Sequence, residues 1–538
     1  LVHDLQIAGF EANALSYDYT TSIECLSKPY APQYNGGIIS NPELNHGLRG
    51  WSKFGDAKIE HKESGGNKFV VAHSRNQPYD SVSQKVYLQK DKLYTFSAWI
   101  QISEGSDPVT AAFKTNTGVE FAGVTVAESG CWSMLKGGLT VNASGPAELY
   151  FESKNTSIGI WVDSISLQPF TQEEWRFHQD QSLEKTRKRK VRIQALDKQG
   201  NPLPNATMVI EQKRLRFPFG CAINKNILGN TAYQKWLTSR FTVTTFENEM
   251  KWYSNEQSWG YEDYSVSDAM LQFAKQHNIL VRGHNILWDD PKYQPNWLYS
   301  LSPTDLSRAV EQRIFSVVSR YKNQLIAWDV LNENLHFSFF ESKLGQPSAH
   351  FFDLTHQIDP STILFMNEYN TIEESGDSQS SPAMYLRKLR EIQASNRNTN
   401  MGIGLEGHFT NLNLPYMRAS IDTLAATNMP VWLTEVDVAS SPNQANYLDQ
   451  ILREAHSHPK VQGIVIWSPW KPGGCYRMCL TDNNFNNLAT GNVVDNLLRE
   501  WGALDSLTGM TDANGFFEAS LFHGDYEMKL THSMNSSL

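Results

Sequence analysis

Two glutamates in the second half of the chain stand at the ends of apolar runs, in positions suited to acid–base chemistry. Glu333 ends the run WDVLNE, and Glu435 lies in the later run VWLTEVD. Cleavage of a glycosidic bond needs two carboxyl groups, one to protonate the leaving oxygen and one to attack the anomeric carbon or activate water. Their pKa values must differ, and neighbouring groups create that difference. The pair therefore indicates glycosidic chemistry as the first hypothesis.

Groups that could bind a sugar follow several other apolar runs in the same half of the chain. Sugar rings stack on flat aromatic faces, and sugar hydroxyls need polar partners. The aromatic candidates are Trp252, Trp288, Trp467 and Trp470, and the polar candidates are Asn248, Lys251, His284, Asn332 and His408. Asp437 and the charged residues near His408 could bias the pKa of Glu435. No phosphate loop, metal-ligand cluster or nucleophile elbow in the sequence competes for this site.

The runs that carry these residues alternate with helix-length amphipathic stretches between 217 and 505. Strands are predicted at 217–223, 241–247, 279–284, 325–333, 362–368, 402–408, 431–437 and 463–469, with helices at 262–277, 303–321, 381–395 and 443–456. Eight such repeats predict a (β/α)₈ TIM barrel, whose active site is built at the carboxyl ends of the strands. A doubly wound open sheet is the competing architecture. It would usually show a glycine-rich phosphate turn, and none is present.

The sequence on either side of this unit predicts β structure, so the chain is expected to be multidomain. Residues 1–37 are interpreted as an arm, and 38–170 as an all-β, jelly-roll-like sandwich, because short alternating runs are broken by Gly, Asn, Ser and Pro. Residues 171–216 are expected to be a linker and a strand pair, and 506–538 a second strand-rich piece and tail. These pieces either pair into one small β-unit around the inserted barrel or form two independent hairpins against its floor.

Charge and hydropathy exclude some partners. The formal net charge of −10 argues against nucleic acid, and no apolar run is long enough to span a membrane. The basic run TRKRK at 186–190 is interpreted as a solvated lead into a strand rather than as a binding patch. We expect a monomer.

Several features favour an extracellular protein. A removed signal peptide would explain the start at Leu1, and so would a trimmed chain. Cys475 and Cys479 could close a small loop in an oxidising compartment, and an odd number of cysteines leaves at least one unpaired. N-glycosylation sequons occur at Asn142, Asn155, Asn205 and Asn535.

The runs FENEMKW, VRGHNILW, WDVLNEN and LTEVDV, in this order, resemble the signature blocks of glycoside hydrolase family ten, the endo-β-1,4-xylanases. The resemblance covers about 217–505 and implies retaining hydrolysis of internal bonds of cell-wall xylan without a cofactor. It implies that Glu333 is the acid/base, that Glu435 is the nucleophile, and that Asp437 and His408 orient the nucleophile. Binding of sugar on the non-reducing side is implied for Glu247, Asn248, Lys251, His284, Trp288, Asn332, His408 and Trp467.

The chain departs from the family pattern at three places. Glu406 stands where the family usually has glutamine, and Asp289, Asp290 and Pro291 replace a histidine and a nearby glutamine. The run SPWKPGGCYRMC replaces the usual loop near the eighth strand. These departures leave the preferred xylan decoration open, and the carboxyl group of Glu406 could shift the working pH.

Residues 38–170 resemble a family twenty-two carbohydrate-binding module through NPELNHGLRGW, the YTFSAW run and WVDSISL. The resemblance implies xylan binding with Arg75, Tyr79, Tyr150 and Glu152 as contacts, and a structural Ca²⁺ held with help from Asp163 and Glu43. Trp51, Trp99, Trp132 and Trp161 are better interpreted as core residues. A module followed by the barrel most resembles the plant xylanases of the family, which implies a cell-wall location.

Two other functions fit the same residues. A xylan transglycosylase would use the same glutamates and pass the glycosyl group to another sugar instead of water. A wall-polysaccharide-binding protein with a silent barrel is also conceivable, although a silent barrel has no need of both Glu333 and Glu435.

Overall fold

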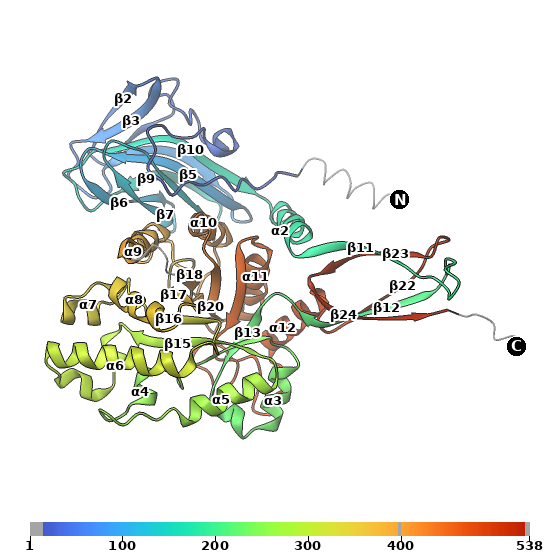
Figure 1. The fold of residues 1–538 in the computed structure, drawn as a ribbon. Helices are drawn as coiled ribbons and strands as arrows, with labels where there is room; N and C mark the ends of the chain where they lie inside the picture. The colour runs from blue at the N-terminus through green and yellow to red at the C-terminus, as the bar shows by residue number, and fades with distance from the viewer. Residues whose placement is uncertain (1–13, 396–399, 533–538) are drawn as a thin grey trace, which may run out of the picture.

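The computed structural model describes residues 14–395 and 400–532, so the first part of the predicted arm and the sequon at Asn535 lie outside the described residues. Figure 1 shows three parts: a β-sandwich, a barrel below it, and a small β-unit that projects from the side of the barrel. Among the described residues, no helix has the length and apolar character needed to cross a membrane.

The barrel consists of eight parallel strands and is closed, because β13 pairs with both β14 and β21. The strands are β13 (Phe219–Ile223), β14 (Val243–Phe246), β15 (Leu280–Trp288), β16 (Ala327–Asn332), β17 (Ile363–Glu368), β18 (Met401–Leu405), β20 (Val431–Val438) and β21 (Val461–Ile466), with a short β19 (His408–Phe409) beside β20. Every residue of β16 and of β20 is buried, as expected for strands covered on both faces. The predicted TIM barrel is confirmed, with a strand at each of the eight predicted positions.

Helices cover the outside of the barrel. The four predicted helices correspond to α5 (Ser265–Gln276), α6 (Pro303–Tyr321), α9 (Pro382–Ser395) and α11 (Gln444–Ser457). α6 begins where predicted because the Ser302 side chain accepts a hydrogen bond from the Asp305 amide and Pro303 occupies the first turn. The remaining helices are α3 (Thr231–Thr238), α4 (Trp252–Asn255), α7 (Phe339–Leu344), α8 (Ser348–Ile358), α10 (Leu414–Ala425) and α12 (Ala489–Glu500), and short 3₁₀ segments lie at Gln33–Gly36, Lys225–Leu228, Pro291–Tyr293 and Asn296–Ser300.

The N-terminal β domain is a sandwich of two five-stranded antiparallel sheets, in the orders β1-β4-β9-β6-β7 and β2-β3-β10-β5-β8. Its strands are β1 (Ser52–Phe54), β2 (Lys58–Ser64), β3 (Asn67–His73), β4 (Ser81–Leu88), β5 (Leu93–Ile102), β6 (Ser106–Lys114), β7 (Val119–Glu128), β8 (Ser133–Leu139), β9 (Gly145–Glu152) and β10 (Ile160–Phe170). Trp51, Trp99 and Trp132 are buried, and Trp161 is half-buried, in line with their interpretation as core residues.

The small β-unit joins the two pieces of chain that flank the barrel. β11 (Lys188–Gln194) pairs with β23 (Phe516–Phe522), and β12 (Thr207–Leu215) pairs with both β22 (Ser506–Met510) and β24 (Gly524–Thr531). The pieces therefore pair with each other, and two independent hairpins are excluded.

A helix, α2 (Gln172–Thr186), lies within the segment that was expected to begin as a linker. Its sequence has few apolar residues, so periodicity gave no signal, although Thr171 and Glu174 form a capping box at its start. The side chains of Trp175 and Gln179 donate hydrogen bonds to Glu454 of α11, at 2.8 and 2.5 Å. Polar contacts with the barrel thus stabilise this helix.

A buried polar cluster joins the sandwich to the barrel. Lys136 Nζ of β8 lies 2.9 Å from Asp422 Oδ2 of α10, and both side chains are at most 3% exposed. The Tyr17 hydroxyl donates to the same Asp422 oxygen at 2.6 Å, so the arm also contributes. Ion pairs this deeply buried hold their partners in one geometry.

Two disulfides bridge the described residues. The suggested Cys475–Cys479 bond is present, and Cys25–Cys131 attaches the arm to the sandwich. Cys221 remains unpaired and buried.

Candidate active site

The two predicted catalytic glutamates are connected through two asparagines. Glu333 follows the last residue of β16, and Glu435 lies in β20. The Asn367 amide nitrogen donates to Glu435 Oε1 at 3.0 Å and to Asn332 Oδ1 at 2.9 Å. The Asn332 amide nitrogen lies 3.3 Å from Glu333 Oε1 and donates to it. The carboxyl groups of Glu333 and Glu435 are thus joined through the side chains of Asn332 and Asn367, at the carboxyl ends of the barrel strands.

Glu333 adopts a left-handed backbone conformation, with φ of 59°. Its backbone N–H donates to the Asn367 carbonyl at 2.9 Å. Non-glycine residues adopt this conformation at a cost that surrounding structure must offset, and functional sites are where such residues gather.

The surroundings drive the pKa values of the two glutamates apart. Burial, together with the negative charges of Glu368 and Glu435, raises the pKa of Glu333 to about 8. Burial also acts to raise the pKa of Glu435, but His284, His408 and Lys251 outweigh it and lower that pKa to about 2. At neutral pH, Glu333 therefore carries a proton and Glu435 is ionised, as an acid and a nucleophile require.

Two histidines face Glu435, and an aspartate orients each of them. His284 Nδ1 lies 2.8 Å from Asp329 Oδ2, and His284 Nε2 lies 3.6 Å from Glu435 Oε1. His408 Nδ1 lies 3.0 Å from Asp437 Oδ1, and His408 Nε2 lies 3.4 Å from Glu435 Oε2. A histidine with one nitrogen against a carboxylate presents a defined N–H at the other.

Two charged residues of this arrangement escaped the sequence analysis. Asp329 Oδ1 also lies 2.7 Å from Arg282 Nη2. Arg477 Nε donates a hydrogen bond to Asp437 Oδ1 at 2.7 Å. A charged residue in the middle of an otherwise apolar buried strand was the available signal for Asp329. Arg477 lies in the unusual loop of 468–480, for which no such signal exists.

Glu406 and Asp289, two of the residues that depart from the family pattern, lie in different surroundings. Glu406 lies beside the catalytic pair, and burial and the charges of Glu435 and Glu333 raise its pKa well above the ordinary value. Asp289 is buried away from the pair, where its Oδ1 accepts a hydrogen bond from the Phe340 amide at 2.8 Å. Burial raises the pKa of Asp289 to about 7. Asp289 thus holds the start of α7 in place.

Aromatic and cationic side chains form one wall of the site. Lys251 Nζ lies 4.3 Å from the ring centre of Trp288 and 5.6 Å from that of Trp467. The Trp288 ring stacks on Tyr293 with 4.1 Å between ring centres. Trp467 meets the ring of His284 at 5.3 Å. Flat faces beside a buried ammonium group suit the predicted binding of a sugar ring and its hydroxyls.

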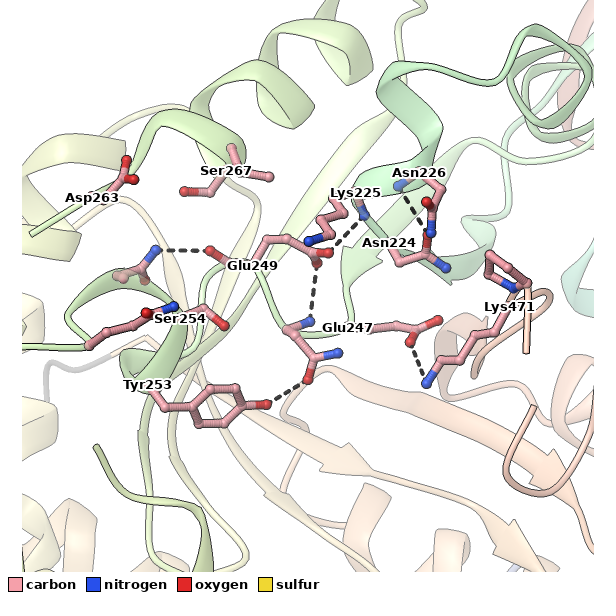
Figure 2. A pocket seen from close by; sticks show the side chains of 15 residues that line it. Asn224, Lys225, Asn226, Glu247, Glu249, Tyr253, Ser254, Asp263, Ser267 and Lys471 are labelled. Atoms are coloured by element: carbon pink, nitrogen blue, oxygen red, sulfur yellow. Dashed lines mark hydrogen bonds and ion pairs between the residues drawn. The ribbon is translucent and has the colours of Figure 1, made fainter. Parts of the chain in front are cut away.

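A polar cavity of about 580 Å³ extends the site past Glu247 and Asn248. Figure 2 shows Lys471 pointing at Glu247. Lys471 Nζ lies 2.8 Å from Glu247 Oε2, and the Tyr253 hydroxyl donates to Asn248 Oδ1 at 2.5 Å. Further amides in the wall come from Asn224, Asn226 and Asn255. Lys471 belongs to the 468–480 loop, so this departure reaches the cavity.

Two of the predicted aromatic residues do not join the site. Trp470 packs against Tyr233 and Phe485 in the main core, and its indole N–H donates to Asn483. The indole N–H of Trp252 donates to Glu256 at 2.8 Å. Both rings are buried, so the expectation that they stack on sugars is corrected.

The residues close enough to hold a metal ion, among free side chains of the described residues, are Glu406, His408 and Glu435. Asp437 and the two glutamates raise the pKa of His408 well above the ordinary value, against the effect of burial. The raised pKa favours the protonated imidazole, which donates hydrogen bonds to these carboxylates.

The sandwich carries a second aromatic cluster, on the sheet that contains β1 and β9. The ring of Tyr150 stacks on Phe54 with 4.1 Å between centres, and Tyr79 meets Phe54 at 6.0 Å. The Tyr150 hydroxyl donates to Glu152 at 2.8 Å. Tyr79 is exposed, and Phe54 is a half-buried member that the sequence analysis missed. Tyr150 is buried, so the expectation that its ring contacts a polysaccharide is corrected.

Arg75 is not available to this cluster. Its guanidinium donates five hydrogen bonds to backbone carbonyls of the sandwich, which uses every N–H that an arginine side chain has. The expectation that Arg75 contacts a polysaccharide is therefore corrected, and the side chain holds two loops together.

Comparison with known proteins agrees with this architecture. A family model described as glycosyl hydrolase family 10 matches residues 208–487, and one described as a carbohydrate binding domain matches 36–157. Endo-1,4-beta-xylanase 5-like of Arabidopsis thaliana is 39% identical over 99% of this chain and 92% of its own length. Endo-1,4-beta-xylanase 5 of the same plant is 42% identical over 84% of this chain and 81% of its own length. Endo-1,4-beta-xylanase 4 is 40% identical over 92% and 84%.

Proposed function

Because the chain belongs to glycosyl hydrolase family 10, we propose that it hydrolyses internal β-1,4 bonds of xylan by a retaining double displacement. The observation that carries this proposal is the placement of two glutamates at the carboxyl end of the barrel, where Asn332 and Asn367 link them by hydrogen bonds. Glu333 is poised as an acid, and Glu435 as an ionised nucleophile.

In the first step, Glu435 attacks the anomeric carbon while Glu333 gives its proton to the leaving glycosidic oxygen, and the carbon–oxygen bond breaks. His284 and His408 hold Glu435 ionised until it attacks. In the second step, the Glu333 carboxylate removes a proton from water, which attacks the same carbon and releases Glu435. Two inversions retain the configuration. No cofactor is required, because the two side chains supply both the proton and the nucleophile.

The test replaces Glu435 with alanine and measures reducing ends released from glucuronoxylan and arabinoxylan. We expect the variant to fall to the uncatalysed background while it still binds insoluble xylan. If the wild type is no more active than Glu435→Ala, the result would instead favour a wall-polysaccharide-binding protein whose barrel is catalytically silent. Products made with an added acceptor oligosaccharide separate hydrolysis from transglycosylation, since lengthened chains at modest acceptor concentration contradict simple hydrolysis.

Residues 38–170 are proposed to tether the catalytic barrel of 217–505 to insoluble xylan through Tyr79 and Glu152. Tyr150 is proposed to support this surface from below, because its ring is buried and stacks on Phe54. Tethering raises the effective concentration of substrate without changing the chemistry. The proposed location is the extracellular cell wall, and the proposed state is a monomer. Asn142, Asn155 and Asn205 have exposed side chains and are proposed glycosylation sites, together with Asn535.

A structural Ca²⁺ beside Asp163 and Glu43 is also proposed. Burial raises the pKa of Asp163 to about 7, and the charge of Glu43 adds to the shift. A cation there would keep both groups ionised. No third His, Cys, Asp or Glu of the described residues joins them, so backbone carbonyls would supply the other ligands. We expect Ca²⁺ to raise the melting temperature of the wild type but not of Asp163→Asn.

A further inference from the structure

A second cleft lies at the opposite end of the barrel from the glutamates, where the small β-unit meets the barrel. Its barrel side consists of Pro218, Thr242 and Leu280, at the amino ends of β13, β14 and β15. Its other side comes from β11, β12, β23, β24 and the residues between them. The volume is about 580 Å³. In Figure 1 the β-unit projects beside β13 and α12. The two glutamates lie toward the carboxyl ends of β16 and β20, on the other side of the barrel's length.

Three arginines line this cleft, and we call it the arginine cleft: Arg189, Arg214 and Arg216. All three are exposed, and within 14–395 and 400–532 no carboxylate lies at ion-pair distance from any of them. Asp525 is the single acid in the lining. The cleft therefore holds an excess of positive charge that the described chain does not neutralise.

The excess of positive charge also affects a histidine in the wall of the cleft, His523. The pKa of His523 is lowered by burial and by the positive charges of Arg189, Arg216 and Arg187. Arg187 donates to the carbonyls of His456 and His458, whereas in the cleft Arg214 makes one longer hydrogen bond, from its Nη2 to the Asn278 carbonyl at 3.3 Å. Among the described residues, the guanidinium groups of Arg189 and Arg216 have no hydrogen-bond acceptor, so their donors are free to bind a ligand.

The sequence shows the same asymmetry. Residues 185–216 contain ten Lys and Arg against two Asp and Glu, a net of +8. The rest of the chain has 37 against 55, a net of −18. The run at 186–190 does lead into β11, as expected, but Arg189 of that run lines the arginine cleft. A local basic surface on an acidic protein concentrates anions at one place.

We propose that the arginine cleft binds a carboxylate-bearing segment of an acidic polysaccharide. Arginine offers a planar fork that matches a carboxylate, and such charge-assisted bonds are strong. Phe522 and Tyr526 contribute aromatic surface to the same wall, which suits sugar rings better than a bare ion. The acidic remainder of the chain disfavours nucleic acid, whose phosphates are far denser. The site would anchor the enzyme without entering the catalytic cycle, so it goes beyond the proposed function and does not depend on it.

The experiment measures binding of the full chain, with Glu435→Gln in every variant to stop hydrolysis. The probes are polygalacturonate, glucuronoxylan and neutral arabinoxylan, so that a carboxylate on a separate polymer is distinguished from one on the xylan itself. The test variant is Arg189→Gln/Arg214→Gln/Arg216→Gln. The control, Lys185→Gln/Lys190→Gln/Lys198→Gln, removes the same charge from exposed side chains that do not line the cleft.

We expect the arginine variant to bind at least one acidic polymer roughly tenfold more weakly, with binding of arabinoxylan unchanged and the control unaffected. Added salt should weaken the wild-type interaction. Equal losses in both variants, or no loss in the arginine variant, would overturn the proposal. Binding of duplex DNA as tight as that of polygalacturonate would also overturn it. A melting curve and unchanged arabinoxylan binding show that the arginine variant is folded.

Discussion

Glu406 and Glu435 share the same two partners. The Asn367 amide nitrogen donates to Glu406 Oε1 at 3.2 Å and to Glu435 Oε1 at 3.0 Å. His408 Nε2 lies 3.3 Å from Glu406 Oε2 and 3.4 Å from Glu435 Oε2. Two carboxylates this close cannot both ionise readily, and the one that keeps its proton is Glu406. Because Glu406 is neutral, the positive charge of His408 is available to stabilise the ionised form of Glu435.

The first prediction concerns the stability of Glu406→Gln. The raised pKa of Glu406 stabilises the fold fully below the unfolded pKa of about 4.3. That contribution is lost as pH rises through the folded-state pKa. Glutamine keeps the neutral shape at every pH. We therefore expect the melting temperature of Glu406→Gln relative to wild type to rise by a few degrees between pH 4 and pH 7. A pH-independent difference would contradict the shared-proton arrangement.

The second prediction concerns the activity of the same variant. At pH 6 we expect kcat/KM within about threefold of wild type, because glutamine mimics the protonated acid. As pH rises through the raised pKa of Glu406, its carboxyl group in the wild type ionises and competes for His408, so the variant should lose activity at a higher pH than the wild type. The measurement is the pH profile of kcat/KM for both proteins. Superimposable alkaline limbs would exclude Glu406 as a group that limits activity.

The third prediction tests Lys471, which compensates the buried charge of Glu247. Burial raises the pKa of Glu247, and Lys471 opposes that effect. Without the ammonium group, Glu247 accepts hydrogen bonds from a sugar less well. We expect Lys471→Ala to raise KM for xylohexaose about tenfold, or about 1.4 kcal/mol, with kcat little changed. Lys471→Arg keeps the charge and should restore most of the affinity. An unchanged KM in Lys471→Ala would remove Glu247 from the substrate contacts.

The fourth prediction concerns the sandwich. Tyr79→Ala removes an exposed ring of the aromatic cluster, and we expect binding of insoluble xylan to weaken roughly tenfold. Tyr87→Ala, an exposed tyrosine of β4 outside the cluster, is the matched control. Arg75→Met should act differently, by destabilising the fold by more than about 3 kcal/mol because buried carbonyls lose their donors. Pull-down on insoluble xylan and urea unfolding separate the two effects.

The fifth prediction concerns the junction of sandwich and barrel. Lys136, His458 and Arg418 lower the pKa of Asp422, against the effect of burial. Its stabilisation is present above the unfolded pKa and is lost as pH falls toward the lower folded-state value. We expect Asp422→Asn to cost about 3–5 kcal/mol at pH 7, and less in acid. Asp449→Asn, which breaks a more exposed pair with Arg453, should cost no more than about 1 kcal/mol.

The barrel could be predicted from the chain alone, and so could the meeting of Glu333 and Glu435 at one end of it. Eight apolar runs at regular spacing leave few architectures, and a parallel barrel brings the carboxyl ends of all its strands to one face. Glu333 and Glu435 therefore converge whatever the loops do. The same logic placed His284, Asn332 and His408, because each follows or ends a strand.

The neighbours that these residues meet could not be predicted, because they come from distant parts of the chain. Asn367 links the two glutamates by hydrogen bonds, and Trp470 packs into the core. Arg75 donates all its hydrogen bonds to backbone carbonyls. Each of these outcomes depends on groups that are distant in sequence. The pairing of β11 with β23 likewise joins segments on either side of the whole barrel. Glu406 shows the difference most clearly: its residue type was visible in the chain, but its proton follows from burial beside Glu435 and from partners that the two must share.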